Sequence, residues 1–407
     1  MDPSRYNNEG NGIPYITGAS NLEDGKVAIN RWTDSPTTHA TDGDLLITCK
    51  GSGVGKMAWC DICDAHIARQ IMALRCVDGL LSGFLEIVIS AMLSNIRSKA
   101  NGLIPGLSRE IILEMMFPLP SLEEQKRICS KSREILSYID GLNSQKSELV
   151  GSVGILKSKI LDLAIRGQLV PQDPNDEPAS VLLERIRAEK EELIKQGKLK
   201  RDKKESVIFR GEDNSYYLRT EELVESLEDW DFEELPDSWS VCCLGELCDY
   251  GNCTNIDTAD IADSAWILDL EDIEKDSGVV LQKVRQGERN AGSTKHRFHK
   301  GQVLYSKLRP YLNKVVLADE DGYCTSEILP LEFERNILPQ YARYFLMSPA
   351  FLRYANKCSY GVKMPRLGTA DGKKAIISVP PVKEQKRIIM AIELAFAQLA
   401  SIAENFA

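Results

Sequence analysis

The chain has 407 residues, of which 43% are hydrophobic and 27% are charged. These proportions exclude a disordered or collagen-like chain, and the length predicts about two to three domains. The formal net charge of −10 argues against a uniformly basic nucleic-acid-binding protein, although an average can conceal opposed patches. The sequence has no apolar run of about 18 residues and no signal-peptide pattern, so we expect a cytoplasmic protein that spans no membrane and whose eleven cysteines are reduced.

Short motifs recur along the chain and predict a tandem pair of similar units. Residues 124–128 and 384–388 both read Glu-Gln-Lys-Arg-Ile, and a pair of prolines lies upstream of each. Further upstream, residues 43–48 resemble residues 301–306. Because the matches occur in the same order in both halves, we expect each unit to begin as mixed strand and helix and to end in a long helix.

The first unit contains a glycine-rich loop and a cysteine pair that match known sites only in part. Residues 51–57 have one residue too few for a phosphate-binding loop, and Met57 stands where such a loop needs Ser or Thr. We interpret the segment as a turn between two strands, with Lys56 kept as a candidate phosphate contact. Cys60 and Cys63 form one pair, whereas a structural zinc site commonly needs two.

A long helix is expected after Ser121, because no proline follows until Pro171 and apolar residues recur every seven positions. A helix that reaches Arg166 would be roughly 70 Å long. Residues 381–407 repeat the spacing, so we expect an antiparallel coiled coil; the alternative is that each stripe packs on its own domain. The predicted coiled-coil contacts are Ile128, Ile135, Leu142, Leu149, Leu156, Leu163, Ile388, Ile392, Ala395, Leu399 and Ile402.

The charge is distributed unevenly after this helix. Residues 167–234 read as a connecting loop, a charged helix and an acidic linker. Residues 281–316 then hold nine basic residues and one acidic residue, with Tyr305 and Tyr311 among them. Such density predicts contact with nucleic-acid phosphates, and a solvated face is the alternative. Residues 1–110, with ten basic and twelve acidic residues, give a much weaker signal.

Taken together, these motifs resemble the DNA specificity subunit of type I restriction–modification enzymes. The resemblance rests on residues 118–128 and 380–388, on the central region 161–204, and on the segment 235–246 that opens the second unit with Leu-Pro-x-x-Trp. It covers essentially the whole chain.

The resemblance implies an α+β fold. Two pseudo-repeated mixed α/β target-recognition domains would be separated by two long helices that form an antiparallel coiled-coil spacer. The implied parts are a first recognition domain (1–120), a central spacer helix (121–166), a connecting region (167–234), a second recognition domain (235–380) and a C-terminal spacer helix (381–407). The opening at 235–247 has no counterpart in the first unit, so we expect the first domain to be incomplete at its N-terminus.

The resemblance also implies a function. Each domain would read one half of a split site in double-stranded DNA, and the helices would set the gap between the halves. The subunit would use no cofactor and perform no catalysis, but recruit two methyltransferase subunits and, through them, restriction subunits. The central helix and the loop 169–179 are the expected partner-binding segments.

The expected DNA contacts are cations and polar residues in the two domains. A coiled-coil scaffold that binds no DNA and an enzyme that uses the cysteine cluster are the competing functions. The candidate DNA-binding residues are Lys50, Ser52 and Lys56 in the first domain, and Arg297, Lys307, Arg309, Tyr311 and Lys314 in the second.

Overall fold

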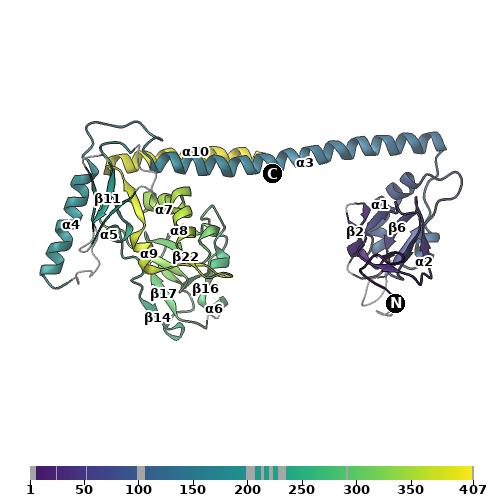
Figure 1. Cartoon of the computed structure of the whole chain (residues 1–407), viewed down its shortest axis with the longest axis horizontal. Helices are drawn as coiled ribbons and strands as arrows, with labels where there is room; N and C mark the ends of the chain where they lie inside the picture. Colours follow the sequence, from purple (N-terminus) through teal and green to yellow (C-terminus); the bar gives the residue numbers. More distant parts are fainter. Residues whose placement is uncertain are drawn as a thin grey trace. The chain divides into compact units, whose positions relative to one another are not determined.

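The structure is a computed structural model that describes residues 6–23, 25–51, 53–98, 106–198, 207–211, 215–219, 223–227, 235–289 and 292–405. The chain divides into two compact units, Met1–Gln145 (unit 1) and Lys146–Ala407 (unit 2). The division falls within α3 (Leu122–Ile165), the predicted long helix (Figure 1). Ser121 caps α3, because its Oγ accepts a hydrogen bond from the backbone N–H of Glu124 at 3.4 Å.

Unit 1 is built from short strands followed by helices. Its elements are β1 (Ile13–Ile16), η2 (Ala19–Asn21), β2 (Leu22–Glu23), β3 (Lys26–Val27), β4 (Trp32–Thr33), β5 (His39–Ala40), β6 (Leu45–Thr48), β7 (Met57–Trp59), β8 (Ala65–Ile67), β9 (Ile71–Leu74), α1 (Ser82–Ser98) and α2 (Arg109–Leu113). One sheet has the order β4-β1-β8-β5, with β1 and β8 parallel, and the other is the antiparallel sheet β7-β6-β9.

Strand β6 is the centre of unit 1, because both of its faces are buried. Leu46 packs in one apolar cluster with Ile16, while Leu45 and Ile47 point the other way into a cluster with Ile89. This alternation follows from the two-residue period of a strand. The predicted strand at 45–47 is therefore confirmed, and the glycine-rich loop after it is the turn from β6 to β7, as interpreted from its sequence.

Unit 2 starts with the C-terminal part of α3 and the connecting region. Its further elements are α4 (Ala179–Lys195), β10 (Val207–Arg210), β11 (Tyr216–Arg219), β12 (Val224–Ser226), β13 (Ser240–Cys243), α5 (Leu244–Leu247), β14 (Asn255–Ile256), η3 (Thr258–Asp260), β15 (Trp266–Leu268), η4 (Leu270–Asp272), β16 (Val284–Arg285), α6 (Gln286–Arg289), β17 (Lys295–Phe298), β18 (Val303–Ser306), η5 (Pro310–Leu312), β19 (Val315–Leu317), β20 (Gly322–Thr325), β21 (Ile328–Leu331), α7 (Pro339–Met347), α8 (Pro349–Lys357), β22 (Ser359–Tyr360), β23 (Arg366–Leu367), α9 (Thr369–Lys374), β24 (Ile376–Val379) and α10 (Val382–Asn405). The acidic linker falls largely outside the described residues.

The two units share one topology, which confirms the predicted tandem repeat. The order β16-β15-β20-β17 in unit 2 matches β4-β1-β8-β5 in unit 1, including the parallel pair at its centre. Likewise, β19-β18-β21 matches β7-β6-β9. Unit 2 adds β14 at the edge of its larger sheet. The fold is therefore mixed α and β structure present twice, with a helix closing each copy.

The repeated Glu-Gln-Lys-Arg-Ile motif owes its structural role to the glutamine. Gln125 is 0% exposed; its Oε1 accepts from the Leu81 backbone N–H at 2.9 Å, and its Nε2 donates to the carbonyls of Gly79 and Pro120 at 2.9 Å. Gln385 is also 0% exposed and makes the same three bonds, to Leu338, Asn336 and Pro380. In each unit the glutamine thus ties the closing helix to the residue just before α1 (Leu81) or α7 (Leu338).

The two long helices pack against each other inside unit 2, where α10 runs along the C-terminal half of α3 (Figure 1). The Ser378 hydroxyl, just before α10, donates to the Ile165 carbonyl at 2.7 Å, and the Lys157 Nζ lies over the Phe396 ring, 5.5 Å from its centroid. Later residues of α10 thus meet earlier residues of α3, so the pair is antiparallel as predicted.

The predicted seam is buried only in part. Ile388, Ile392 and Leu399 are buried, and Leu149, Leu163, Ala395 and Ile128 are half-buried. Ile135, Leu142, Leu156 and Ile402 are instead 43 to 65% exposed, and the residues of α3 that bury deepest in unit 2 are Val153, Leu161, Ala164 and Ile165. A straight helix drifts by about 20° per heptad from a strict seven-residue repeat, which moves the buried stripe off the predicted positions.

Helix α10 is long and apolar enough to cross a membrane by length and composition. Its buried residues include Glu384, Gln385 and Ile388, and the Phe396 ring meets Tyr344 of α7 edge-on, with centroids 6.0 Å apart. Since one face of α10 packs on α3 and α7, we interpret it as a helix of the unit 2 core.

Candidate nucleic-acid interface

The loop between β18 and β19 carries four of the predicted contacts, Lys307, Arg309, Tyr311 and Lys314. Arg309 and Asn313 both have φ of 49°, a left-handed conformation that turns the chain sharply on either side of η5. Tyr311 is 49% exposed within this turn. Tyr305 lies in β18 and is 3% exposed, so it belongs to the core and cannot contact a ligand at the surface.

A hairpin that the sequence analysis missed lies beside this loop. It consists of β22, β23 and the turn between them. The Leu367 N–H donates to the Lys307 carbonyl at 3.0 Å, and the Arg309 N–H donates to the Pro365 carbonyl at 2.7 Å. Arg366 pairs with both carboxylate oxygens of Glu327, at 2.8 Å for the shortest contact. These bonds hold the hairpin firmly against the loop.

The loop and the hairpin form a surface of cations, aromatic rings and apolar side chains. Val362, at the tip, is 101% exposed. Lys307 and Lys363 form no ion pair with any described residue, and the Nε of Arg309 is buried without a described partner. We call this set the hairpin surface, and its members are Lys307, Arg309, Tyr311, Tyr360, Val362, Lys363 and Met364.

The chemistry of the hairpin surface suits DNA. Free cations attract phosphates, while Arg and Lys can donate to the edge of guanine in the major groove and an apolar side chain can meet the methyl group of thymine. Both strands of the hairpin are short and are bonded to the loop and to Glu327 at their base, so the tip projects into solvent. The signal present in the sequence was the apolar and basic run Val-Lys-Met between Gly361 and Pro365.

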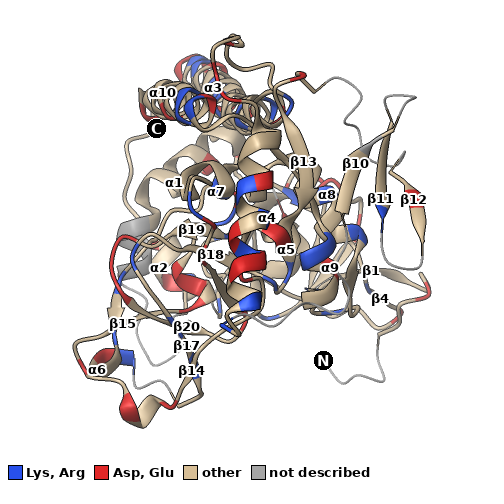
Figure 2. Ribbon diagram, turned by 90° about the vertical axis from the view of Figure 1, so that its left-hand side faces the viewer, with Lys and Arg blue, Asp and Glu red and all other residues tan. Residues whose placement is uncertain are grey.

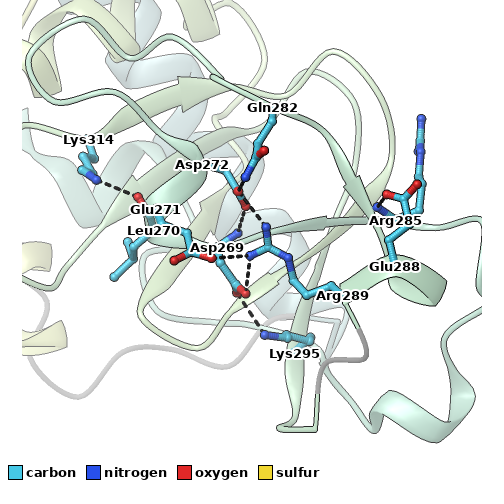
Figure 3. Close-up of polar contacts among 10 residues, drawn as sticks. All are labelled: Asp269, Leu270, Glu271, Asp272, Gln282, Arg285, Glu288, Arg289, Lys295 and Lys314. Atoms are coloured by element: carbon cyan, nitrogen blue, oxygen red, sulfur yellow. Dashed lines mark hydrogen bonds and ion pairs between the residues drawn. The ribbon is translucent and has the colours of Figure 1, made fainter. Parts of the chain in front are cut away.

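Four of the nine basic residues at 281–316 are paired with neighbouring acids, so the net charge of the run overstates its free charge. Arg289 bonds to Asp269 and Asp272, both at 2.7 Å, and Lys295 bonds to Asp269 at 3.0 Å (Figure 3). In and just before β16, Lys283 bonds to Asp319 at 2.7 Å and Arg285 bonds to Glu320 at 2.7 Å; both acids lie between β19 and β20. The acids come from outside the run, which is why the count over 281–316 overstated the free charge.

The cluster around Asp269 is a structural one. Burial alone would raise the pKa of Asp269, but hydrogen bonds from Arg289 and Lys295 hold that pKa below its ordinary value. Lys314, a predicted DNA contact, lies beside this cluster and donates to the Leu270 carbonyl at 2.6 Å (Figure 3). Burial lowers the pKa of Lys314. Its position favours a role in packing, and Arg297, exposed on β17, remains the other predicted contact outside the hairpin surface.

Opposite charges are also interspersed elsewhere in unit 2. The ribbon of α4 carries both basic and acidic residues along its length (Figure 2). Arg187 pairs with Glu246 at 2.9 Å, and Lys190 pairs with Glu334 at 3.0 Å. The hairpin surface is a place in the described part of the chain where cations without an acidic partner among the described residues lie near one another.

Unit 1 has a loop at the same position, between β6 and β7. Lys50 and Lys56 are exposed there, and Ser52 lies outside the described residues. The Leu107 N–H donates to the Cys49 carbonyl at 2.7 Å, which is the counterpart of the bond from Leu367 to Lys307. The residues that would correspond to the hairpin tip are 101–105, which also lie outside the described residues.

Among the described residues, the cysteines are not grouped with other metal-ligating side chains. All eleven are free thiols; Cys60 is buried with its Sγ 3.6 Å from the Ile62 carbonyl, and Cys63 is exposed. Within the described ranges, no group of three or more His, Cys, Asp or Glu side chains is arranged to hold a metal ion. Burial raises the pKa of Cys60, which opposes formation of a reactive thiolate.

The architecture defines a class of protein with two tandem copies of one mixed α/β domain, each followed by a long helix. Residues 236–401 match the family model described as type I restriction modification DNA specificity domain. This match confirms the resemblance read from the sequence.

Curated relatives carry the same description. The chain is 30% identical over 274 residues to the type I restriction enzyme EcoAI specificity subunit of Escherichia coli, which covers 65% of this chain and 42% of that protein. It is 32% identical over 246 residues to the EcoEI specificity subunit of the same species, covering 58% and 37% respectively. The matches thus span about two fifths of the length of these relatives.

Solved structures share the fold. A chain from a study entitled "Structural basis underlying complex assembly and conformational transition of the type I R-M system" aligns with a TM-score of 0.62 at 14% identity, covering 97% of this chain and 86% of that one. The HsdS subunit from Thermoanaerobacter tengcongensis aligns with a TM-score of 0.50 at 16% identity, covering 97% and 85%.

Proposed function

We propose that this chain is the DNA specificity subunit of a type I restriction–modification complex. Two recognition domains, residues 1–120 and 235–380, each read one half of a bipartite site in double-stranded DNA. The observation that carries the proposal is the repeated topology, with a cation-bearing loop at the same position in both units. One domain repeated twice is suited to reading two half-sites, since each copy can address one of them.

The spacer helices set the gap between the half-sites in this proposal. A helix advances about 1.5 Å per residue, so the length of α3 converts directly into a distance. Helices α3 and α10, with the loop 169–179, also recruit two methyltransferase subunits and, through them, restriction subunits. The chain itself performs no chemistry and needs no cofactor, because the methyl transfer and the cleavage belong to the partner subunits.

The electrostatics favour a shared DNA clamp. The formal charge of −10 and the pairing of four of the nine cations in residues 281–316 with acids reduce the charge that can attract a phosphate backbone. We therefore expect the isolated chain to bind DNA weakly, and the methyltransferase subunits to supply further positive charge.

The proposal is tested with the complex reconstituted from this chain and its methyltransferase subunits. The complex is incubated with random duplexes, and the bound fraction is sequenced. We expect enrichment of one bipartite sequence with a fixed gap. A double variant, Lys307→Glu with Lys363→Glu, is expected to lose at least tenfold in affinity and to lose the half of the sequence read by unit 2.

A matched control separates DNA reading from a general charge effect. Lys275 is an exposed lysine elsewhere in unit 2, and Lys275→Glu is expected to leave the enriched sequence unchanged. If the complex assembles but enriches no sequence, the chain is a coiled-coil scaffold and the proposal is wrong.

A further inference from the structure

The last strand of unit 2 is covered by another strand of the chain. β24 pairs with β13 in antiparallel register, from Ser240 opposite Val379 to Cys243 opposite Ile376. All four residues of β24 are buried. Val241 and Cys243 of β13 share an apolar cluster with Ile376 and Ile208 of β10. The strand that leads into α10 is therefore sealed from solvent on this edge.

No described strand covers the corresponding segment of unit 1. Residues 116–119 precede Pro120 and the buried Gln125, just as β24 precedes Pro380 and the buried Gln385. Met116 is nevertheless 89% exposed and Leu119 61% exposed. Leu113 and Leu122, on either side, are 69% and 44% exposed. No backbone hydrogen bond joins residues 116–119 to any other described residue. We call residues 113–122 the open edge.

The open edge retains the hydrogen-bonding groups that a partner strand requires. The Leu244 N–H donates to the Ala375 carbonyl at 2.7 Å, so Ala375 faces β13. Because facing residues alternate in an antiparallel ladder, Ile377 and Val379 face β13 as well, and Ser378 faces away. The Ser378 carbonyl accepts from the Tyr341 hydroxyl at 2.9 Å, on the side opposite β13.

Pro118 occupies the position that faces away. It stands where unit 2 has Ser378, so the N–H that proline lacks is one that the ladder does not use. Phe117 and Leu119 stand where Ile377 and Val379 face β13, and their backbone groups are free to pair. The sequence of the open edge is therefore compatible with one added strand, and its exposed apolar side chains would be buried by that strand.

We propose that the open edge is a docking site for an extended peptide segment with the pattern of β13, in which a tryptophan precedes a short strand of small apolar residues. We take this pattern from the strand that covers the equivalent edge in unit 2, where Trp239 and Val241 are each 4% exposed. The occupant pairs antiparallel with residues 116–119 and adds its side chains to the apolar surface of Met116 and Leu119. This site lies within unit 1 and goes beyond the proposed reading of DNA.

The test uses a fluorescently labelled peptide with the sequence of residues 235–248 of this chain, added to the full chain under reducing conditions. Fluorescence anisotropy is expected to show saturable binding. Leu119→Asp in the protein is expected to weaken binding at least tenfold. Val77→Asp, at another exposed apolar position of unit 1 (76% exposed), is the matched control and is expected to change the affinity less than twofold.

Two peptide variants test the strand pairing itself. Cys242 faces β24 in the ladder of unit 2 and Cys243 faces away, so Cys242→Pro removes a required N–H and Cys243→Pro does not. We expect Cys242→Pro to abolish binding and Cys243→Pro to retain most of it. Absence of saturable binding, or an equal loss with both peptides, overturns the proposal. Light scattering provides a further test. If the chain forms a dimer that Leu119→Asp disrupts, a second copy of the chain occupies the open edge and the proposal is overturned.

Discussion

Units 1 and 2 have the same strand order but bury different amounts of the segment that leads into the closing helix. In unit 2 that segment is strand β24, paired with β13 and buried along its whole length. In unit 1 the corresponding residues 116–119 are unpaired among the described residues, and Met116 is 89% exposed. The difference shows that the shared topology depends on the two sheets and the buried glutamine, while the outer strand is an addition.

The largest expected effect contrasts the isoleucines of the repeated motif. Ile388→Ala removes a side chain that is 0% exposed in the large core of unit 2, and we expect a loss of about 3 to 4 kcal/mol. Ile128→Ala removes its half-buried counterpart in unit 1, and we expect about half of that loss. Urea unfolding followed by tryptophan fluorescence measures both. Equal losses would show that the two helices are packed equally well.

The glutamines are expected to behave alike in the two units. Gln125→Ala and Gln385→Ala each leave a buried N–H and two carbonyls without their partner, and we expect each to cost about 2 kcal/mol. Urea unfolding again provides the measurement. Lys126→Ala, at an exposed neighbouring position, is the control and is expected to be nearly neutral. A large cost in one unit only would contradict a common anchoring role.

The cations of the two loops are expected to contribute to DNA affinity if the proposed function is correct. Lys307→Ala in unit 2 and Lys50→Ala in unit 1 should each weaken binding by about tenfold or less and reduce the salt dependence by about one charge. Lys283→Ala should change affinity less than twofold, because Lys283 is already paired with Asp319 at 2.7 Å. Titrations of the reconstituted complex at several salt concentrations distinguish these outcomes.

Acid sensitivity is the smallest expected effect and compares one carboxylate in each unit, the buried Asp44 and the half-buried Asp269. Burial opposes the charge of Asp44 and Asp269, but hydrogen bonds from Arg75 and Arg289 respectively hold each pKa below its ordinary value. A depressed pKa stabilises the folded state above the unfolded pKa, about 3.9, and that stability is lost as pH falls through the folded pKa.

Asp44→Asn and Asp269→Asn should therefore lower stability at neutral pH and flatten its decline below about pH 4. Unfolding free energies measured across this range check the sign. A variant that declines as steeply as the unaltered chain would show that the carboxylate in question does not stabilise its unit.

Much of the fold follows from local patterns in the sequence. The repeated motifs predict the two units, and the proline-free heptad stretch predicts a helix within two residues of the observed Leu122–Ile165. The strands at 45–48 and 303–306 coincide with glycine-bounded apolar runs. These features depend on neighbours close in sequence, for which spacing and turn residues carry enough information.

The candidate interface was less predictable, because it depends on contacts between distant segments. Lys283, Arg289 and Lys295 lie in the basic run, but their acidic partners lie outside it and meet them only after folding. The hairpin beside Arg309 belongs to the surface because Pro365 bonds to that loop across more than fifty residues. A count of charges along a stretch of sequence detects neither the ion pairs with distant acids nor the hairpin packed beside the loop.

The sequence by itself determined the repeat, the helical spacer and the family resemblance, since each is written in residues that are adjacent or regularly spaced. Only the tertiary structure decided which cations remain free, which aromatic side chain is exposed and which edge is closed. Charge pairing and burial arise when segments far apart in the chain come together, so they are properties of the folded chain.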